Sequence, residues 1–215
     1  MDTHILNFIN NQLAHPSLDV FMAAFTSWAV WWPFLALTSV LALVFGNFQT
    51  RAMLLAVGLA VGMSDGLVCK NLKHLVGRPR PHQVLSGIRV VDLASATPRI
   101  LAVALPLNIA TSSPARPAER GNAFPSSHVA NCFAIAMVCF LCRRNWGWIV
   151  FLPAALIGFS RMYVGVHWPS DVLAGSLIGM TCGLIVVMAL RWLWRRFGQR
   201  LAPALYEAHP ELMKS

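Results

Sequence analysis

Long apolar segments with almost no charged residues are the feature that most restricts how this chain can fold. No charged residue occurs between Val20 and Thr50, and the densest part of that segment, 28–45, is long enough to cross a bilayer as a helix. Hydrophobic residues make up 57% of the chain and charged residues 12%, whereas soluble domains carry about 25% charged residues. We therefore predict an all-α fold, a polytopic membrane helix bundle that forms a single domain over 1–215.

Five apolar segments are predicted to span the membrane. They cover residues 28–45, 52–75, 125–143, 146–160 and 172–190. Before them, residues 2–14 have apolar positions spaced as in an amphipathic helix, which we expect to lie along the membrane surface. Asp65, in the second segment, would cost about 2.5–3.5 kcal/mol at the bilayer centre, so we expect its side chain to point into the bundle.

Residues 81–124 interrupt the apolar pattern with prolines and scattered charges. Their one apolar run, 100–107, is too short to span, so we predict an extramembrane loop with a piece that lies on the membrane surface. Such a loop could select the lipid by contacting a second phosphate or an anionic headgroup, or it could be a tether only. The basic side chains available for that contact are Arg89, Arg99, Arg116 and Arg120.

The net charge of +9 indicates an anionic partner. Because the background is apolar and no arginine-rich tract is present, we predict a lipid phosphate in the bilayer and not a nucleic acid. Arginines at 51, 143–144 and 191–200 would all lie on one side of the five predicted spans, which the positive-inside rule makes cytoplasmic. The other side also holds many basic residues, an excess that an anion-binding site there would explain.

Polar chemistry is concentrated in residues 160–171, between two apolar runs. Pro169 suits the first turn of a helix, and the spacing from His167 to Asp171 would let the carboxylate approach one imidazole nitrogen. That contact would fix the tautomer and leave the other nitrogen free to act as a nucleophile. Arg161 offers a planar guanidinium that suits two phosphate oxygens. The alternative interpretation is an interfacial histidine and an aspartate that caps the helix.

Two further polar clusters are predicted to lie on the same side of the bundle. Residues 73–81 are basic and end in prolines that stop the helix, so they could also be a charged membrane anchor. Residues 124–128 start a helix with Pro125, and its first N–H groups could bind phosphate or could be capped by an ordinary serine.

Taken together, the three clusters resemble the three-part signature of the type-2 phosphatidic acid phosphatase superfamily. The matching residues are Lys73, Arg80 and Pro81, then Pro125, Ser126, Ser127 and His128, then Ser160, Arg161, His167 and Asp171. The resemblance covers about 65–180 of the chain. One position departs from the pattern, because Ser127 stands where the family usually has glycine. Lys70 and Arg78 lie beside the first cluster, but only Lys73 and Arg80 have the family spacing.

The resemblance implies a role for each matching residue. His167 is the nucleophile that forms a phosphohistidine, Asp171 orients it, and His128 protonates the leaving oxygen and later activates water. The phosphoryl oxygens are bound by Lys73, Arg80, Ser126, Arg161 and the backbone near Ser127. No metal or other cofactor is expected. The five cysteines lie in apolar segments, so we interpret them as buried hydrophobic residues and not as a disulfide set or a zinc site.

The function that follows is a metal-independent lipid phosphate or diphosphate phosphatase, similar to bacterial phosphatidylglycerophosphatase B or undecaprenyl diphosphatase. We expect a multi-pass protein of the bacterial inner membrane with its site on the periplasmic or external side. The alternatives are a phosphotransferase that uses a lipid or sugar acceptor and, in another class, a non-catalytic lipid-binding or transport protein. Phosphatidate, phosphatidylglycerol phosphate, polyprenyl diphosphate and lipid A phosphates all remain open as substrates, and so does the oligomeric state.

Overall fold

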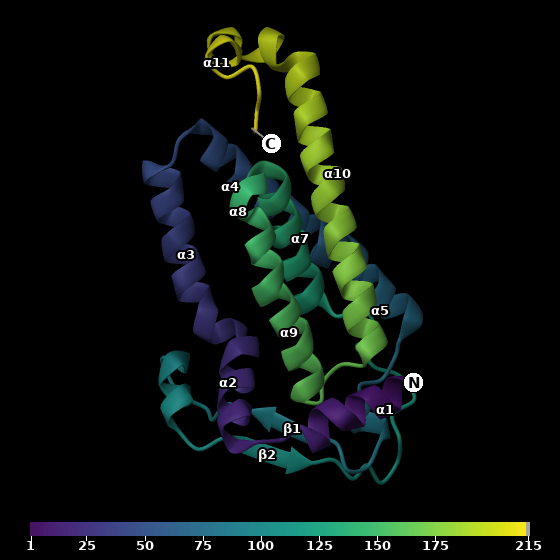
Figure 1. Ribbon diagram of the computed structural model, residues 1–215. Coiled ribbons are helices and arrows are strands. Elements are labelled where there is room, and N and C mark those ends of the chain that lie inside the picture. Colours follow the sequence, from purple (N-terminus) through teal and green to yellow (C-terminus); the bar gives the residue numbers. More distant parts are fainter. Residues whose placement is uncertain (214–215) are drawn as a thin grey trace.

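The computed structural model describes residues 1–213 and consists mainly of helices packed side by side (Figure 1). The central pair is α7 (Ser127–Cys142) and α10 (Pro169–Leu201), and α9 (Phe151–Tyr163) packs against α7. Two further helices are α3 (Trp28–Phe45) and α4 (Phe48–Val61). The helix α4 packs against α7 and α10, and α3 contacts α4. The predicted helix bundle is confirmed in its main features.

Three helical runs among the described residues are long and apolar enough to cross a membrane. They are α3, the run Phe48–Val84, and α10. The second run joins α4 to a π-helical segment, η2 (Gly62–Cys69), and to α5 (Lys70–Val76). The other two predicted spans are shorter, because α7 has 16 residues and α9 has 13. At about 1.5 Å per residue, neither covers the roughly 30 Å hydrocarbon core as a regular α-helix.

The segment before α9 explains why the regular helix begins later than the predicted span 146–160. Residues 144–150 form a one-turn helix, α8 (Arg144–Gly147), and a 3₁₀ turn, η4 (Trp148–Val150), before the regular helix begins. A short 3₁₀ segment has an apolar composition like that of a helix, so hydropathy alone does not separate the two.

The N-terminal residues form a helix as predicted, but its apolar side contacts the protein. The segment consists of α1 (Asp2–Asn7), the π-helical η1 (Phe8–Gln12) and a separate α2 (Pro16–Thr26), which was not predicted. Leu6 is fully buried and belongs to a cluster with Ile88, Ala123 and Trp168. The N-terminal helix therefore covers the end of the bundle at which α10 begins (Figure 1).

Residues 81–124 contain regular structure, which corrects the all-α prediction. After α6 (Pro81–Val84), strands β1 (Arg89–Asp92) and β2 (Asn108–Thr111) pair antiparallel, with Arg89 opposite Thr111. Between them lies η3 (Arg99–Ala104), a 3₁₀ helix at the position of the predicted surface piece. The strands are only four residues long, and segments so short give little periodicity from which a strand could be predicted.

Asp65 lies on the exposed side of η2, so the prediction that it points into the bundle is wrong. The buried residues of this segment are Ser64 and Cys69, five positions apart, which matches a π-helical turn. The prediction rested only on the cost of a charge at the bilayer centre, which does not say which face of the segment packs against the bundle. All five cysteines are free thiols, of which four are buried and one is partly buried.

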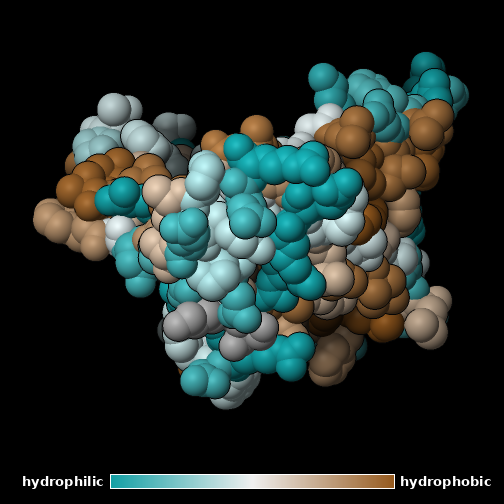
Figure 2. Space-filling view, turned by 90° about the horizontal axis from the view of Figure 1, so that it is seen from above, coloured by the Kyte–Doolittle hydropathy of each residue, from teal (hydrophilic) through white to brown (hydrophobic). Residues whose placement is uncertain are grey.

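The end of the bundle at which α10 finishes is hydrophilic. Figure 2, viewed from the end where α10 finishes, shows hydrophilic side chains gathered at this end and hydrophobic ones along the sides. The last turns of α10 continue past the predicted end at 190, through Arg191, Arg195, Arg196 and Arg200, and are followed by α11 (Pro203–Ala208). This end holds the arginines that were predicted to be cytoplasmic.

Three glycines on one face of α10 allow it to approach α7 closely. A Cβ atom added at Gly175 would lie 2.6 Å from the carbonyl oxygen of Ser126, and one at Gly183 would lie 2.8 Å from that of Ala134. At Gly179, midway between them, a Cβ atom would overlap the carbonyl oxygen of Ala130. Small residues at every fourth position bring two helix backbones together in this way, and here they hold the start of α7 against the start of α10.

Gly179→Ala is expected to destabilise the protein by about 1–3 kcal/mol, because the two backbones must separate to admit the methyl group. The measurement is the thermal unfolding midpoint of the detergent-purified protein. Gly58→Ala in α4 is the matched control, since a Cβ atom there meets nothing within 4 Å. A midpoint for Gly179→Ala equal to that of the control would contradict the close packing of α7 and α10.

Candidate functional site

The three polar clusters identified in the sequence meet at one end of the bundle (Figure 1). The helix α5 ends at Val76 and is capped by Gly77, whose φ of 59° gives the left-handed turn that glycine adopts without strain. The chain then passes next to the start of α7, where the Ala123 N–H donates to the Arg78 carbonyl at 2.8 Å. The Ser126 N–H donates to the Asp171 carbonyl at 3.1 Å, which joins the start of α7 to the start of α10.

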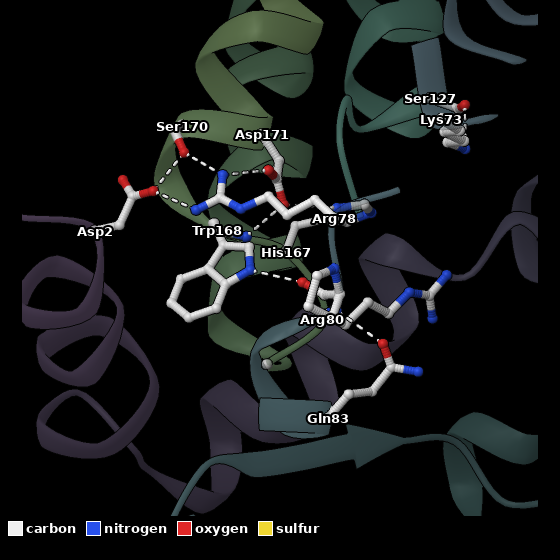
Figure 3. A network of polar contacts seen from close by, with 12 residues as sticks. Asp2, Lys73, Arg78, Arg80, Gln83, Ser127, His167, Trp168, Ser170 and Asp171 are labelled. Atoms are coloured by element: carbon white, nitrogen blue, oxygen red, sulfur yellow. Dashed lines mark hydrogen bonds and ion pairs between the residues drawn. The ribbon is translucent and has the colours of Figure 1, made fainter. Parts of the chain in front are cut away.

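His167 and Asp171 lie beside each other in the turn that leads into α10 (Figure 3). His167 Nδ1 is 3.5 Å from Asp171 Oδ2, a contact slightly longer than a strong hydrogen bond. His167 is 3% exposed and Asp171 is fully buried. Asp171 also caps α10, because its Oδ2 accepts a hydrogen bond from the Trp168 N–H at 2.9 Å. Both interpretations of Asp171, as a cap and as a partner of His167, therefore apply.

His167 is held as a neutral imidazole. Burial lowers its pKa to about 4, and the positive charges of Arg161 and Arg80 act in the same direction, while Asp171 opposes them. A neutral imidazole has a free nitrogen lone pair, which a nucleophile requires.

This lowered pKa predicts where activity falls in acid. With His167 as the predicted nucleophile, protonation would remove its free lone pair only near pH 4, so kcat/KM should remain level as the pH falls past 6.5, the ordinary histidine value. The measurement is kcat/KM against pH for an aryl phosphate with a good leaving group, corrected for the titration of the substrate. An acid limb at about 6.5 would contradict a neutral, buried His167.

Lys73 and the first turn of α7 form the second part of the site. Lys73 Nζ donates to Ser127 Oγ at 2.6 Å. Ser126 is fully buried, and its Oγ is one of the buried polar atoms with no hydrogen-bond partner. A lysine, an unpaired hydroxyl and a helix N-terminus are groups that can bind the oxygens of a phosphate.

Two arginines complete the basic surroundings of His167. Arg161 donates to Thr26 Oγ1 at 2.9 Å, and its buried Nε has no partner. Arg80 is close enough to Arg161 for their like charges to interact, and its side chain extends away from Asp2 and Ser170 (Figure 3). The Arg80 N–H donates to the side chain of Gln83 at 2.8 Å, which fixes the start of α6. Two neighbouring guanidinium groups repel each other, and a bound anion would relieve that repulsion.

His128, in the first turn of α7, is partly buried and lies within electrostatic range of Arg161, His167 and Lys73. The exposed Asp65 in η2 is also close enough to interact electrostatically with His128. The structure thus brings all eight of the predicted site residues to one end of the bundle.

Arg78 is the contact residue that sequence reasoning missed, because it lies outside the family spacing. Its Nη1 donates to Asp171 Oδ1 at 2.8 Å and to Ser170 Oγ at 2.6 Å, and its Nη2 donates to Asp2 Oδ2 at 2.9 Å (Figure 3). Its guanidinium carbon also lies 5.0 Å from the ring centre of Trp168. The one available signal was the placement of Arg78 inside the first motif, two residues before Arg80.

The arginines of residues 81–124 divide into two groups. Arg89 is paired with Asp19 at 2.6 Å, and Arg99 is paired with Asp92 at 3.3 Å. Arg116 and Arg120 are exposed. Arg116 and Arg120 are therefore the loop arginines that remain free to contact a lipid headgroup among the described residues. That they do so stays a prediction.

A cavity of about 240 Å³ lies at the opposite end of the molecule, between the end of α10 and the C-terminal segment. It is lined by Arg191, Trp194, Arg195, Pro210, Glu211, Leu212 and Met213. None of these residues belongs to the three clusters, so the cavity is not part of the candidate site. In residues 1–213, no three His, Cys, Asp or Glu side chains form a group that could hold a metal ion.

Comparison with known proteins gives a family and several curated relatives, of which two are described here. The sequence model of the family described as "PAP2 superfamily" matches residues 50–196. A lipid A 4'-phosphatase of Bacteroides thetaiotaomicron is 31% identical over 186 residues, which cover 83% of this chain and 72% of that protein. The undecaprenyl-diphosphatase BcrC of Bacillus subtilis is 29% identical over 205 residues, which cover 94% of this chain and 87% of that protein.

A solved structure shows the same arrangement of the chain. The crystal structure of Aquifex aeolicus LpxE superimposes with a TM-score of 0.60 and 29% sequence identity. The match covers 87% of this chain and 94% of that chain.

Proposed function

This chain belongs to the PAP2 superfamily of lipid phosphatases, and we propose that it hydrolyses a lipid monophosphate or diphosphate without a metal ion. The observation that carries the proposal is the juxtaposition of His167, Asp171 and the basic residues from three separate segments at one end of the bundle. A protein that only bound or transported lipids would need the cations but not a neutral histidine beside a buried carboxylate.

The reaction follows from the position of each group. The free nitrogen of His167 attacks phosphorus, the P–N bond forms as the bond to the leaving oxygen breaks, and His128 protonates that oxygen. Lys73, Arg80, Arg161, Ser126 and the N–H groups at the start of α7 stabilise the charge on the three equatorial oxygens. His128, now neutral, takes a proton from water, whose oxygen attacks phosphorus and releases phosphate from His167.

The proposal includes a membrane arrangement with about five crossings. The three long helices account for three of them, and α7 and α9 would cross with the help of the non-regular segments beside them. The arginine-rich end would face the cytoplasm, which puts the site at the periplasmic or external face of a bacterial inner membrane. A phosphate at headgroup level would then meet the site while the lipid chains remain between helices.

Phosphate release from a panel of lipids tests the function and its substrate class. Detergent-purified protein would be given phosphatidate, phosphatidylglycerol phosphate, a polyprenyl diphosphate and a lipid A phosphate, with His167→Ala as the blank. We expect release from at least one lipid, and the two substrate classes named by the relatives, lipid A and undecaprenyl diphosphate, are the first to compare. No release from any lipid, under conditions in which the protein remains folded, would contradict the proposal.

The same assay separates hydrolysis from phosphotransfer. A phosphotransferase would pass the phosphoryl group from His167 to a lipid or sugar hydroxyl, so adding an acceptor would yield a phosphorylated acceptor in place of free phosphate. We propose hydrolysis as the main activity.

Turnover is expected to continue in the presence of EDTA, because fixed cations supply the charge stabilisation that a metal ion would otherwise supply. Vanadate should inhibit, because its trigonal-bipyramidal adduct with His167 resembles the transition state. Initial rates with EDTA, with added Mg²⁺ and with vanadate are the measurements. Loss of activity in EDTA with recovery in Mg²⁺ would show that the site depends on a metal.

A further inference from the structure

We propose that Arg78, held by Asp2 of the N-terminal helix, is a positioning residue for the pair formed by Asp171 and His167. The inference rests on the proposed function, in which His167 is the nucleophile. In this proposal α1 supports the active site indirectly, through Asp2 and Arg78, and does not contact the reacting atoms.

The contacts of Asp171 show what Arg78 contributes. Oδ2 of Asp171 faces His167 and accepts the Trp168 N–H, whereas Oδ1 accepts Nη1 of Arg78 at 2.8 Å. Arg78 is thus the only cation paired with this carboxylate among the described residues. Because Asp171 is fully buried, removing that cation leaves a buried carboxylate oxygen without its partner, and the orientation of the carboxylate is then less well fixed.

Arg78 in turn is fixed by three groups besides Asp171 (Figure 3). Nη1 also reaches Ser170 Oγ, Nη2 pairs with Asp2 at 2.9 Å, and the guanidinium lies over the Trp168 ring. A planar fork that spans two carboxylates has one orientation, and a lysine could not reproduce both arms. The guanidinium therefore transmits the position of Asp2 to Asp171.

Asp2 is held in place by a hydrogen bond to its side chain and by the packing of its helix, α1. Its Oδ2 accepts a hydrogen bond from the Ser170 hydroxyl, and α1 is anchored by Leu6, which packs against Trp168 in a buried cluster. Partial burial would raise the pKa of Asp2, but the Ser170 hydrogen bond and the charge of Arg78 outweigh it and lower that pKa. Asp2 thus remains ionised and can hold Arg78 at neutral pH.

The experiment measures kcat and KM for a small aryl phosphate with Arg78→Gln, Asp2→Asn and the double variant. Loss of a residue that orients a catalytic pair typically lowers activity by about 10–100-fold, so we expect Arg78→Gln to lower kcat in that range with KM changed by less than about 3-fold. Asp2→Asn should lower kcat by about 3–10-fold. The double variant should be no slower than Arg78→Gln, because Asp2 acts only through Arg78.

Stability controls separate positioning from a structural role. Arg191→Gln removes a partly buried arginine at the far end of α10, whose Nη2 donates to the Leu141 carbonyl at 2.8 Å, and it should lower the unfolding midpoint without changing kcat. In Arg78→Gly, guanidinium ion added to the assay should restore part of kcat, whereas in Asp171→Ala it should restore none.

Three results would overturn the inference while leaving the proposed function intact. They are an unchanged kcat in Arg78→Gln, losses in Asp2→Asn and Arg78→Gln that multiply in the double variant, and losses confined to KM. An active His167→Ala would instead contradict the proposed function, because the residue that Arg78 is proposed to position would not then be the nucleophile.

Discussion

Replacing His167 with alanine is expected to lower phosphate release from the preferred lipid by at least about 10⁴-fold. The neutral imidazole beside Asp171 is the nucleophile in our account, and alanine leaves no group that can form the P–N bond. Water attacking the bound lipid directly would be the remaining route, assisted only by the cations of the site. The measurement is kcat for lipid hydrolysis by the purified variant.

The fold should survive this change, so the loss can be assigned to chemistry. His167 Nδ1 has no hydrogen-bond partner of good geometry, and Asp171 keeps its contacts with Trp168 and Arg78 when the imidazole is removed. An unfolding midpoint close to that of the unchanged protein is the control. A folded His167→Ala variant that retained more than a few per cent of kcat would show that another group attacks phosphorus.

Replacing His128 with alanine is expected to produce the second largest loss, about 10²–10⁴-fold for a lipid phosphate. An alkoxide is a poor leaving group and needs a proton, which His128 supplies in the proposed mechanism. An aryl phosphate with a good leaving group needs no proton to depart, so its phosphorylation of His167 should slow far less. The comparison is the single-turnover rate of phosphoenzyme formation on the two substrates.

The ratio of the two losses is the diagnostic quantity. His209→Ala, at the opposite end of the bundle where His209 stacks on Phe48, should leave both rates unchanged and serves as the control. Equal losses on lipid and aryl phosphates would remove His128 from the role of acid and leave it as a phosphate-binding or structural residue.

The apolar segments predicted the helical bundle well because burial in a bilayer depends mainly on local composition. Segment length was less predictable, since the 3₁₀ turn before α9 is as apolar as a helix, and α10 continues for eleven residues beyond the predicted 190 to Leu201. The short strands β1 and β2 and the inward face of η2 depend on which segments pack together, so composition does not report them.

The candidate site was predictable to the extent that its chemistry lies in short motifs. Spacing within residues 160–171 indicates the pair of His167 and Asp171. The prolines in or beside each of the three clusters indicate that the clusters lie at helix ends. What spacing does not report is contact between distant segments. The salt bridge from Arg78 to Asp171 joins residues 93 positions apart, and that from Arg78 to Asp2 joins residues 76 apart. Both depend on the docking of α1 and α5 against α10.

The most direct test of the central claim is to trap the covalent intermediate. Protein mixed with a ³²P-labelled substrate and quenched within one turnover should carry label that is stable in base and labile in acid, as a phosphohistidine is, on the peptide that contains His167. The label should be absent from His167→Ala. With a labelled aryl phosphate, whose leaving group needs no proton, it should accumulate in His128→Ala, in which hydrolysis of the intermediate is slowed. An acid-stable label, a label on another peptide, or single-turnover product formation with no labelled protein would contradict the account.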